Sequence, residues 1–180
     1  MSPGDRIRHT TILGLRVGNK AAIGGDGQVT VGDTVMKQNA CKVRRLFRGE
    51  VLVGFAGGAA DALTLFERFE SKLDEFKGNV ERSVVELAKE WRTDKMLRRL
   101  EAQLAVVSRE HVFLVSGTGD IIEPDDGIVA IGSGGPYALA ACRALMKYSN
   151  LEPTQLVRES LEIAASICVF TNANLVIEDL

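Results

Sequence analysis

Two adjacent threonines, Thr10 and Thr11, open the first strand-like run of the chain, behind a leader of nine residues. A threonine hydroxyl is a weak nucleophile at neutral pH until a base removes its proton. An α-amino group titrates at about pH 8 and can act as that base without any histidine. Cleavage of the His9–Thr10 bond would place a free amine and a hydroxyl on the same residue. The chain therefore contains a candidate nucleophile that loss of the leader would activate.

Later segments supply the other groups that such a nucleophile needs. An acid, Asp26, lies in the turn sequence Gly24–Gly27, and a lysine, Lys42, follows it along the chain. An ammonium group beside the hydroxyl would lower the pKa of the hydroxyl and keep a neighbouring amine neutral. Two glycine-rich segments, Gly54–Gly58 and Gly132–Gly135, could offer backbone N–H groups to a developing oxyanion. Together these groups would complete a site built around a threonine nucleophile.

Each of these residues also has an ordinary structural explanation. Threonine favours strands, and Gly-Asp-Gly is a common turn sequence. Lys42 begins a basic run that alternates with apolar residues, which is typical of a strand with one solvated face. The loop Gly132–Gly135 is compatible with a plain strand-to-helix turn or with a phosphate-binding loop at a helix N-terminus. It lacks the lysine of a P-loop and the spacing of a dinucleotide fingerprint, which argues against a phosphate site.

Composition excludes several classes of protein. A length of 180 residues, with 46% apolar and 26% charged residues, predicts a single globular domain in solution. The net charge of −2 does not favour a nucleic-acid-binding protein. No apolar run approaches the roughly 18 residues of a membrane helix, and the leader lacks the apolar core of a signal peptide. Three scattered cysteines without metal-ligand spacing predict buried thiols in a reducing, cytoplasmic environment.

Hydrophobic periodicity predicts strands, then helices, then strands and helices again. Alternating or continuous apolar runs predict strands over 11–17, 21–25, 29–36, 42–47, 50–56, 103–107, 112–116, 121–122, 128–132 and 174–177. We expect 29–36 and 42–47 to pair with each other. A 3.6-residue period predicts helices over 59–76, 80–100, 135–146 and 153–168. The order predicts an α+β fold: a four-layer αββα sandwich of two antiparallel-rich sheets, each flanked by a helix pair.

An ordered set of short motifs carries a family resemblance. In chain order the motifs are Thr10-Thr11-Ile12, Gly25-Asp26-Gly27-Gln28, Gly32–Lys37, Lys42–Leu46, Gly54–Gly58, Glu86–Lys89, Trp91–Asp94, Ala130–Ala138 and Thr171-Asn172. The set resembles the N-terminal-nucleophile hydrolases, the family that includes the β-subunits of the proteasome. The resemblance covers essentially everything after the leader, and it implies the same αββα sandwich.

The resemblance also implies a role for each candidate site residue. Thr10 would be the nucleophile, and its freed amine would take the proton of the hydroxyl directly or through water. Lys42 would lie beside Thr10, and Asp26 would orient this lysine. Gly54 would offer its backbone N–H to the oxyanion. Ser133 would hydrogen-bond the Thr10 amine and help to relay the proton.

Members of the family also bind a cation, usually sodium, through backbone carbonyls near the end of the last helix. The matching positions here are Ala165, Cys168 and Thr171. Alanine replaces the usual glycine at position 165, so the site requires a backbone conformation there that alanine can adopt. The resemblance implies no cofactor for the chemistry itself.

The implied activity is that of a cytoplasmic threonine endopeptidase that degrades unfolded polypeptides. The resemblance implies two stacked hexameric rings, a dodecamer with the active sites inside. The chain has no ATP-binding P-loop, so a hexameric AAA+ unfoldase would consume ATP and deliver the substrate. No nucleic acid or membrane partner is expected. The peptidase domain would span 10–180, and 1–9 would be a leader removed by autolysis.

Three alternatives stay open at the level of sequence. Removal of Met1 would expose Ser2, another hydroxyl with an amine, although Pro3 follows it and the first strand begins only eight residues later. The chain could also be an amidase of the same mechanistic class that acts on a small substrate. Finally, it could be a non-catalytic ring or nucleotide-binding module that retains its leader.

Overall fold

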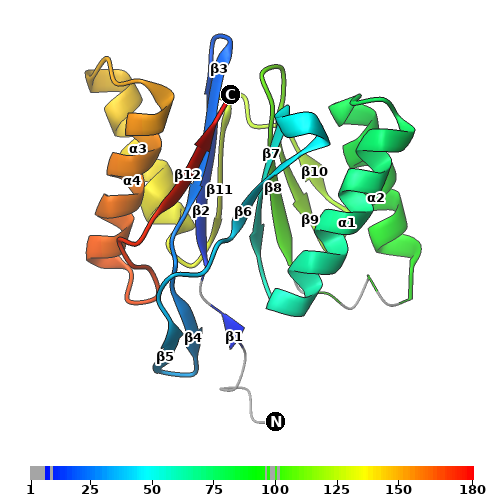
Figure 1. Ribbon diagram of the computed structural model, residues 1–180. Coiled ribbons are helices and arrows are strands. Elements are labelled where there is room, and N and C mark those ends of the chain that lie inside the picture. Colours follow the sequence, from blue (N-terminus) through cyan, green and yellow to red (C-terminus); the bar gives the residue numbers. More distant parts are fainter. Residues whose placement is uncertain (1–6, 9, 96, 98–99, 101) are drawn as a thin grey trace.

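A four-layer sandwich forms the body of the molecule (Figure 1). The computed structural model describes residues 7–8, 10–95, 97, 100 and 102–180. Helices α1 (Ala59–Glu75) and α2 (Val80–Thr93) cover one sheet, and helices α3 (Gly135–Tyr148) and α4 (Pro153–Ile167) cover the other. The two sheets face each other in the middle. The αββα arrangement predicted from the sequence is confirmed.

The sheet under α3 and α4 carries the candidate nucleophile at one end. Its strands, in spatial order, are β11 (Ile128–Gly132), β2 (Thr11–Val17), β3 (Lys20–Gly25) and β12 (Val176–Asp179). All neighbouring pairs are antiparallel. The β2–β3 hairpin turns at Gly18-Asn19, where Gly18 adopts a positive φ of 60°. This hairpin was predicted from the sequence and is confirmed.

The sheet under α1 and α2 is also antiparallel throughout. Its strands, in spatial order, are β10 (Ile121–Ile122), β9 (Val112–Ser116), β8 (Gln103–Val107), β7 (Val51–Ala56) and β6 (Val43–Leu46). A short 3-10 turn, η1 (Phe47–Gly49), reverses the chain between β6 and β7. Strand β7 is buried along its whole length because it lies inside the sheet and between layers.

A small third sheet projects from the open end of the sandwich (Figure 1). Its strands are β1 (Ile7–Arg8), β4 (Val29–Val31) and β5 (Thr34–Lys37), in the order β1–β4–β5. The single strand predicted over 29–36 was therefore wrong, because Gly32, at φ +57°, turns the chain into a hairpin. The expected partner segment 42–47 instead forms β6 and pairs with β7.

Three apolar cores hold the layers together. One lies between the two sheets, one under α1 and α2, and one under α3 and α4. Helix α2 begins where the Asn79 side chain accepts the Arg82 N–H at 2.9 Å, which caps its first turn. It ends at Thr93, seven residues earlier than the periodicity predicted, and the Asp94 side chain accepts the Leu97 N–H at 3.0 Å just beyond it.

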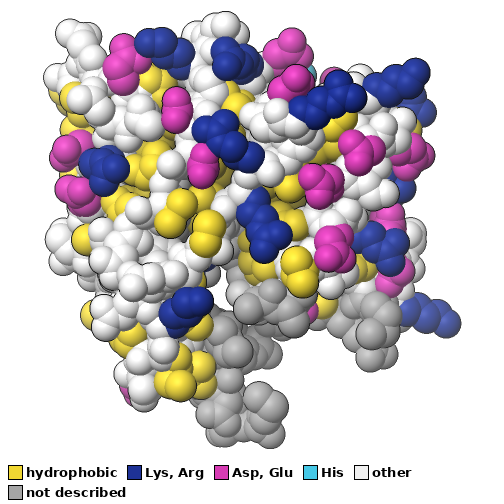
Figure 2. Space-filling view, in the orientation of Figure 1, with side chains coloured by type: hydrophobic (Ala, Val, Ile, Leu, Met, Phe, Trp, Pro, Cys, Tyr) yellow, Lys and Arg dark blue, Asp and Glu magenta, His cyan; other side chains and the backbone are white. Residues whose placement is uncertain are grey.

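The surface carries charges of both signs close together. Figure 2 shows Lys and Arg side chains interspersed with Asp and Glu over the visible face. Such mixing gives this face no extended basic patch for a nucleic acid. None of the helices in the described part of the chain combines the length and apolar character needed to cross a membrane.

Candidate functional site

Thr10 lies directly before β2, at the end of its sheet, and only 8% of its surface is exposed. Its backbone carbonyl accepts a hydrogen bond from the Ser133 N–H at 2.9 Å. Gly132 pairs with Thr11 and adopts a φ of +86°. A Cβ at Gly132 would lie 1.7 Å from the Thr10 carbonyl oxygen, so only glycine permits this approach. The loop between β11 and α3 is thereby held against the candidate nucleophile.

Asp26 is fully buried and connects Thr11 to Lys42. Its Oδ1 accepts the Thr11 N–H at 2.8 Å and the Lys42 ammonium at 2.8 Å. Its Oδ2 accepts the Gln28 N–H at 2.9 Å and the Asn172 N–H at 3.4 Å. A carboxylate has acceptor positions for all four donors. The predicted role of Asp26, to hold the lysine, agrees with this geometry.

The Lys42 ammonium lies near the backbone of Thr11, the residue after the candidate nucleophile, because it shares Asp26 Oδ1 with the Thr11 N–H. Only 8% of its side chain is exposed. Its Nζ also donates to the Gln28 carbonyl at 2.5 Å. Burial lowers the pKa of Lys42, while the charge and hydrogen bond of Asp26 oppose this shift. The site therefore holds a poorly hydrated cation on the same carboxylate that binds the Thr11 N–H.

Ser133 reaches Thr10 through its backbone. The Ser133 N–H donates to the Thr10 carbonyl at 2.9 Å, whereas the residue as a whole is exposed. Its hydroxyl makes no hydrogen bond within the described part of the chain. The predicted neighbourhood of Ser133 and Thr10 is thus present, while contact between the hydroxyl and a Thr10 amine remains a prediction.

The structure gives Gly54 a different role from the predicted oxyanion donor. The Phe55 N–H donates to the Lys42 carbonyl at 3.2 Å, on the β6 side of β7. Backbone directions alternate along a strand, so the Gly54 N–H points to β8, where Gly54 pairs with Ala105. A Cβ at Gly54 would lie 2.5 Å from Ile12 Cγ2. This glycine allows the two sheets to approach closely, and its N–H does not face Thr10.

Backbone donors closer to Thr10 follow the end of β7. Ile12 lies against Gly54, and two residues farther along β2, Gly14 lies against Val107, the partner of Leu52. Continued to the start of β2, the same spacing would place Thr10 opposite Ala56. Gly57 and Gly58 come next, immediately before α1. Their N–H groups lie at the positive end of a helix dipole, which suits a developing negative charge.

The three predicted cation ligands lie together at the carboxyl end of α4. Ala165 lies within the helix, so its replacement of glycine causes no backbone strain. The Cys168 carbonyl accepts the Thr171 N–H at 3.0 Å in the following turn. The last turn of α4 has no basic residue to compensate its carbonyl groups. Backbone oxygens at such an end are suitable ligands for a hard cation.

Three polar residues without a predicted role, Thr11, Gln28 and Asn172, also hold the site, together with Thr171, which was predicted only as a cation ligand. Thr11, Gln28 and Thr171 are buried, with 0%, 6% and 5% of their surfaces exposed. Asn172 bridges two loops, since its Oδ1 accepts the Gly27 N–H at 3.0 Å and its Nδ2 donates to the Gln38 carbonyl at 2.9 Å. Thr11 and Gln28 flank predicted residues in the chain, and Thr171-Asn172 is one of the motifs. Their positions next to predicted residues or within a motif are the sequence signal that could have identified these four residues as part of the site.

Comparisons with known proteins place this site in a family. Residues 8–180 match the proteasome subunit family. The chain is 60% identical over 172 residues to the ATP-dependent protease subunit HslV of Caldicellulosiruptor saccharolyticus, covering 95% of this chain and 98% of the relative.

Solved structures agree. The eukaryotic HslV of Trypanosoma brucei superposes with a TM-score of 0.89 at 48% identity, over 94% of this chain and 98% of that one. BPH of Thiobacillus denitrificans, in a complex with epoxomicin, shares the fold with a TM-score of 0.76 at 23% identity, over 94% of this chain and 97% of that one. The chain described here belongs to the proteasome subunit family.

Proposed function

We propose that this protein is the threonine endopeptidase subunit of a chambered, ATP-dependent protease. The observation that carries the proposal is the buried Lys42–Asp26 pair, which is hydrogen-bonded to the backbone of the dipeptide Thr10-Thr11. The 60% identity to an ATP-dependent protease subunit supports the same conclusion. The substrates are unfolded polypeptides, because a chamber admits extended chains.

In this mechanism the Thr10 Oγ attacks the scissile carbonyl while the free Thr10 amine takes the hydroxyl proton. The Lys42 ammonium favours the alkoxide by its charge and keeps the amine neutral by repulsion. The Gly57 N–H, at the start of α1, stabilises the oxyanion. The protonated amine then gives its proton to the leaving amine. Water attacks the resulting ester, and the same amine acts as base for this second step.

The leader blocks this chemistry while it is attached. In the precursor the Thr10 nitrogen is an amide, which does not accept a proton at neutral pH. Within the leader, β1 pairs antiparallel with β4, with Ile7 opposite Val31 and Arg8 opposite Thr30. An extended substrate that entered the site from this side would compete for the same strand edge. His9 and residues 1–6, including Ser2, lie outside the described residues. Cleavage after His9 by the Thr10 hydroxyl itself would remove both obstacles.

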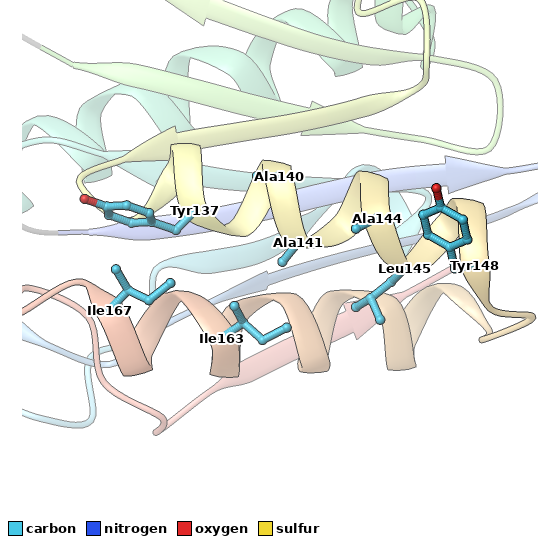
Figure 3. A pocket seen from close by; sticks show the side chains of 8 residues that line it. All are labelled: Tyr137, Ala140, Ala141, Ala144, Leu145, Tyr148, Ile163 and Ile167. Atoms are coloured by element: carbon cyan, nitrogen blue, oxygen red, sulfur yellow. The ribbon is translucent and has the colours of Figure 1, made fainter.

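An apolar groove supports assembly into stacked rings. It measures about 430 Å³ and lies between α3 and α4 (Figure 3). Its lining is almost entirely apolar: Tyr137, Ala140, Ala141, Ala144, Leu145, Tyr148, Ile163 and Ile167. Such a surface favours burial against another subunit. We propose that a second copy covers it where two hexameric rings stack into a dodecamer, and that an AAA+ unfoldase binds the assembly and consumes ATP.

The carbonyls of Ala165, Cys168 and Thr171 would hold a sodium ion or a similar cation. When bound, the ion would stabilise the turn after α4 without entering the chemistry. The protein would act in the cytoplasm, as its free cysteines favour.

Substitution of the nucleophile tests the proposed activity directly. Thr10→Ala removes the attacking hydroxyl but keeps the backbone contacts of the dipeptide. We expect peptide hydrolysis to fall by at least about 1,000-fold, since no other group replaces the nucleophile. The circular dichroism spectrum and the number of subunits in the assembly should match wild type, although each Thr10→Ala subunit keeps its leader. Residual activity within tenfold of wild type would refute the assignment, and small-amide cleavage by an isolated subunit would favour an amidase instead.

A further inference from the structure

Three loops from different parts of the chain meet at Thr11. Its N–H donates to Asp26 in the β3–β4 loop at 2.8 Å. Its hydroxyl accepts the Gly134 N–H from the β11–α3 loop at 3.0 Å. The same hydroxyl lies 2.7 Å from the Thr171 hydroxyl, in the turn that follows α4. Thr11 is fully buried and Thr171 nearly so. One side chain thus connects the loop that carries Ser133 with the end of the last helix.

The hydroxyl of Thr11 has the donor and acceptor groups that this junction requires. A hydroxyl has one hydrogen and two acceptor positions. The Gly134 N–H fills one acceptor position, and the remaining hydrogen and acceptor position allow the Thr11–Thr171 hydrogen bond in either direction. A Cβ at Gly134 would lie 2.4 Å from Thr11 Oγ1 and 2.6 Å from Thr171 Oγ1. The three groups are therefore packed as closely as glycine allows.

We propose that Thr11 and Thr171 form a hydroxyl pair that positions the nucleophile and the Ser133 loop for catalysis. Thr11 follows Thr10 in the chain, so an anchor at its hydroxyl fixes the backbone on one side of the nucleophile. The same anchor fixes Gly134, and the preceding Ser133 N–H holds the Thr10 carbonyl at 2.9 Å. The pair touches neither substrate nor the reacting atoms, and both are positioning residues. This inference rests on the proposed peptidase function.

Valine is the informative replacement because it has nearly the shape of threonine and no hydroxyl. Thr11→Val keeps the strand and its packing but leaves the buried Gly134 N–H without an acceptor. The loop must then shift to find another partner, and Ser133 and Thr10 shift with it. Thr11→Ser restores the hydroxyl and should restore the geometry. Thr171→Val removes the other member of the pair and should have a similar effect.

The test compares kcat and KM for peptide hydrolysis in Thr11→Val, Thr171→Val, the double variant and Thr11→Ser. We expect each valine variant to lose about 30-fold in kcat, with KM unchanged within about twofold, because misplacement affects the chemical step. The double variant should be no more than about threefold worse than either single variant, since the two residues act as a unit. Thr11→Ser should retain at least half of the wild-type kcat.

Ser83→Ala provides the matched control. Ser83 is also a fully buried hydroxyl, and it donates to the Asn79 carbonyl at 2.7 Å in the α2 layer. The valine variants and Ser83→Ala should each lose a few degrees in melting temperature, about 2–4 °C, but only the valine variants should lose kcat. Valine variants that lose stability but keep kcat would overturn the inference. Loss of kcat in Ser83→Ala, or failure of Thr11→Ser to rescue, would do the same.

The outcomes also separate this inference from the proposed function. If Thr10→Ala abolishes hydrolysis while both valine variants keep their kcat, the peptidase assignment stands and the positioning pair is wrong. If Thr10→Ala keeps its activity, the nucleophile itself is wrong, whatever the valine variants do.

Discussion

Lys42 shows how burial makes one lysine different from its neighbours. Its ammonium is nearly excluded from water and bound to Asp26, whereas Lys37 on β5 is exposed. A buried cation acts on a nearby hydroxyl with little screening, and an exposed one is screened by solvent and salt. The sequence presents the two residues five positions apart without indicating which is buried.

This difference predicts unequal effects of substitution. Lys42→Ala should lower kcat/KM for peptide hydrolysis by at least about 100-fold, because the charge that favours the Thr10 alkoxide is lost. Lys37→Ala should stay within about twofold of wild type. Steady-state kinetics of the two variants at one ionic strength provide the measurement. Equal, mild losses would show that neither lysine has a special role.

At the residue scale, the sequence predicted the charged centre better than the donors around it. Asp26 and Lys42 are hydrogen-bonded to each other, and Asp26 also accepts the N–H of Thr11, which follows Thr10 in the chain. The oxyanion role of Gly54 was implied by the family resemblance, and membership of a motif does not show which way an N–H points inside a sheet. Nothing in the sequence assigns a function to Thr11, because a threonine in a strand is common. The two groups that its hydroxyl contacts, the Gly134 N–H and the Thr171 hydroxyl, lie 123 and 160 residues away in the chain.

Among the elements, the β11–α3 loop contacts Thr10 directly, since its Ser133 N–H donates to the Thr10 carbonyl at 2.9 Å. Gly132 has a positive φ and no space for a Cβ, while Gly18, in the β2–β3 turn, has a positive φ with open space around it. The two positions share the same conformational requirement and differ in their surroundings. Substitution of Gly18 therefore tests the effect of backbone strain alone, and substitution of Gly132 tests strain together with displacement of Thr10.

We expect Gly18→Ala to destabilise the fold by about 1 kcal/mol through strain alone, with little change in kcat. Gly132→Ala should cost about 3 kcal/mol or more, because the Thr10 carbonyl must also move. It should lower kcat by at least about 100-fold. Urea unfolding and peptide kinetics of both variants are the measurements. Similar kcat values in the two would show that the loop does not position Thr10.

The sequence predicted the helices and strands correctly where a regular hydrophobic pattern extends over many residues. It failed where the pairing of short strands had to be assigned. The four helices and the β2–β3 hairpin follow from local pattern and turn chemistry. The segment 29–36 reads as one strand until Gly32 turns it, and β6 pairs with β7, the strand that follows it after η1. The last strand begins at Val176, later than predicted, because Asn174 is used in the loop, where its Nδ2 donates to the Gln38 carbonyl at 3.0 Å.

For the whole molecule, the distribution of apolar surface supports the proposal that two rings stack through the groove between α3 and α4. Ile163 on α4 is 40% exposed and lines the groove between α3 and α4. Leu63 on α1 is 48% exposed on the opposite helix layer. A charge at a buried subunit interface is costly because it loses its water, while a charge on a free surface is tolerated.

Ile163→Asp should therefore separate the stacked rings, and Leu63→Asp should leave their stacking unchanged. Light scattering coupled to size-exclusion chromatography would show half of the wild-type assembly mass for the first variant and the full mass for the second. The circular dichroism spectra of both variants should show that their subunits remain folded. An unchanged mass for Ile163→Asp would remove the groove from the proposed ring contact.

In the proposed mechanism, cleavage of the His9–Thr10 bond frees the amine that acts as base and separates the domain from the strand β1 that pairs with β4. The most direct test of the account is the intact mass and N-terminal sequence of wild type and Thr10→Ala, purified in the same way. We predict that wild type begins at Thr10 and that Thr10→Ala retains its leader, because the Thr10 hydroxyl must cut the bond that precedes it. Fully active wild-type protein that still carries the leader would contradict the mechanism.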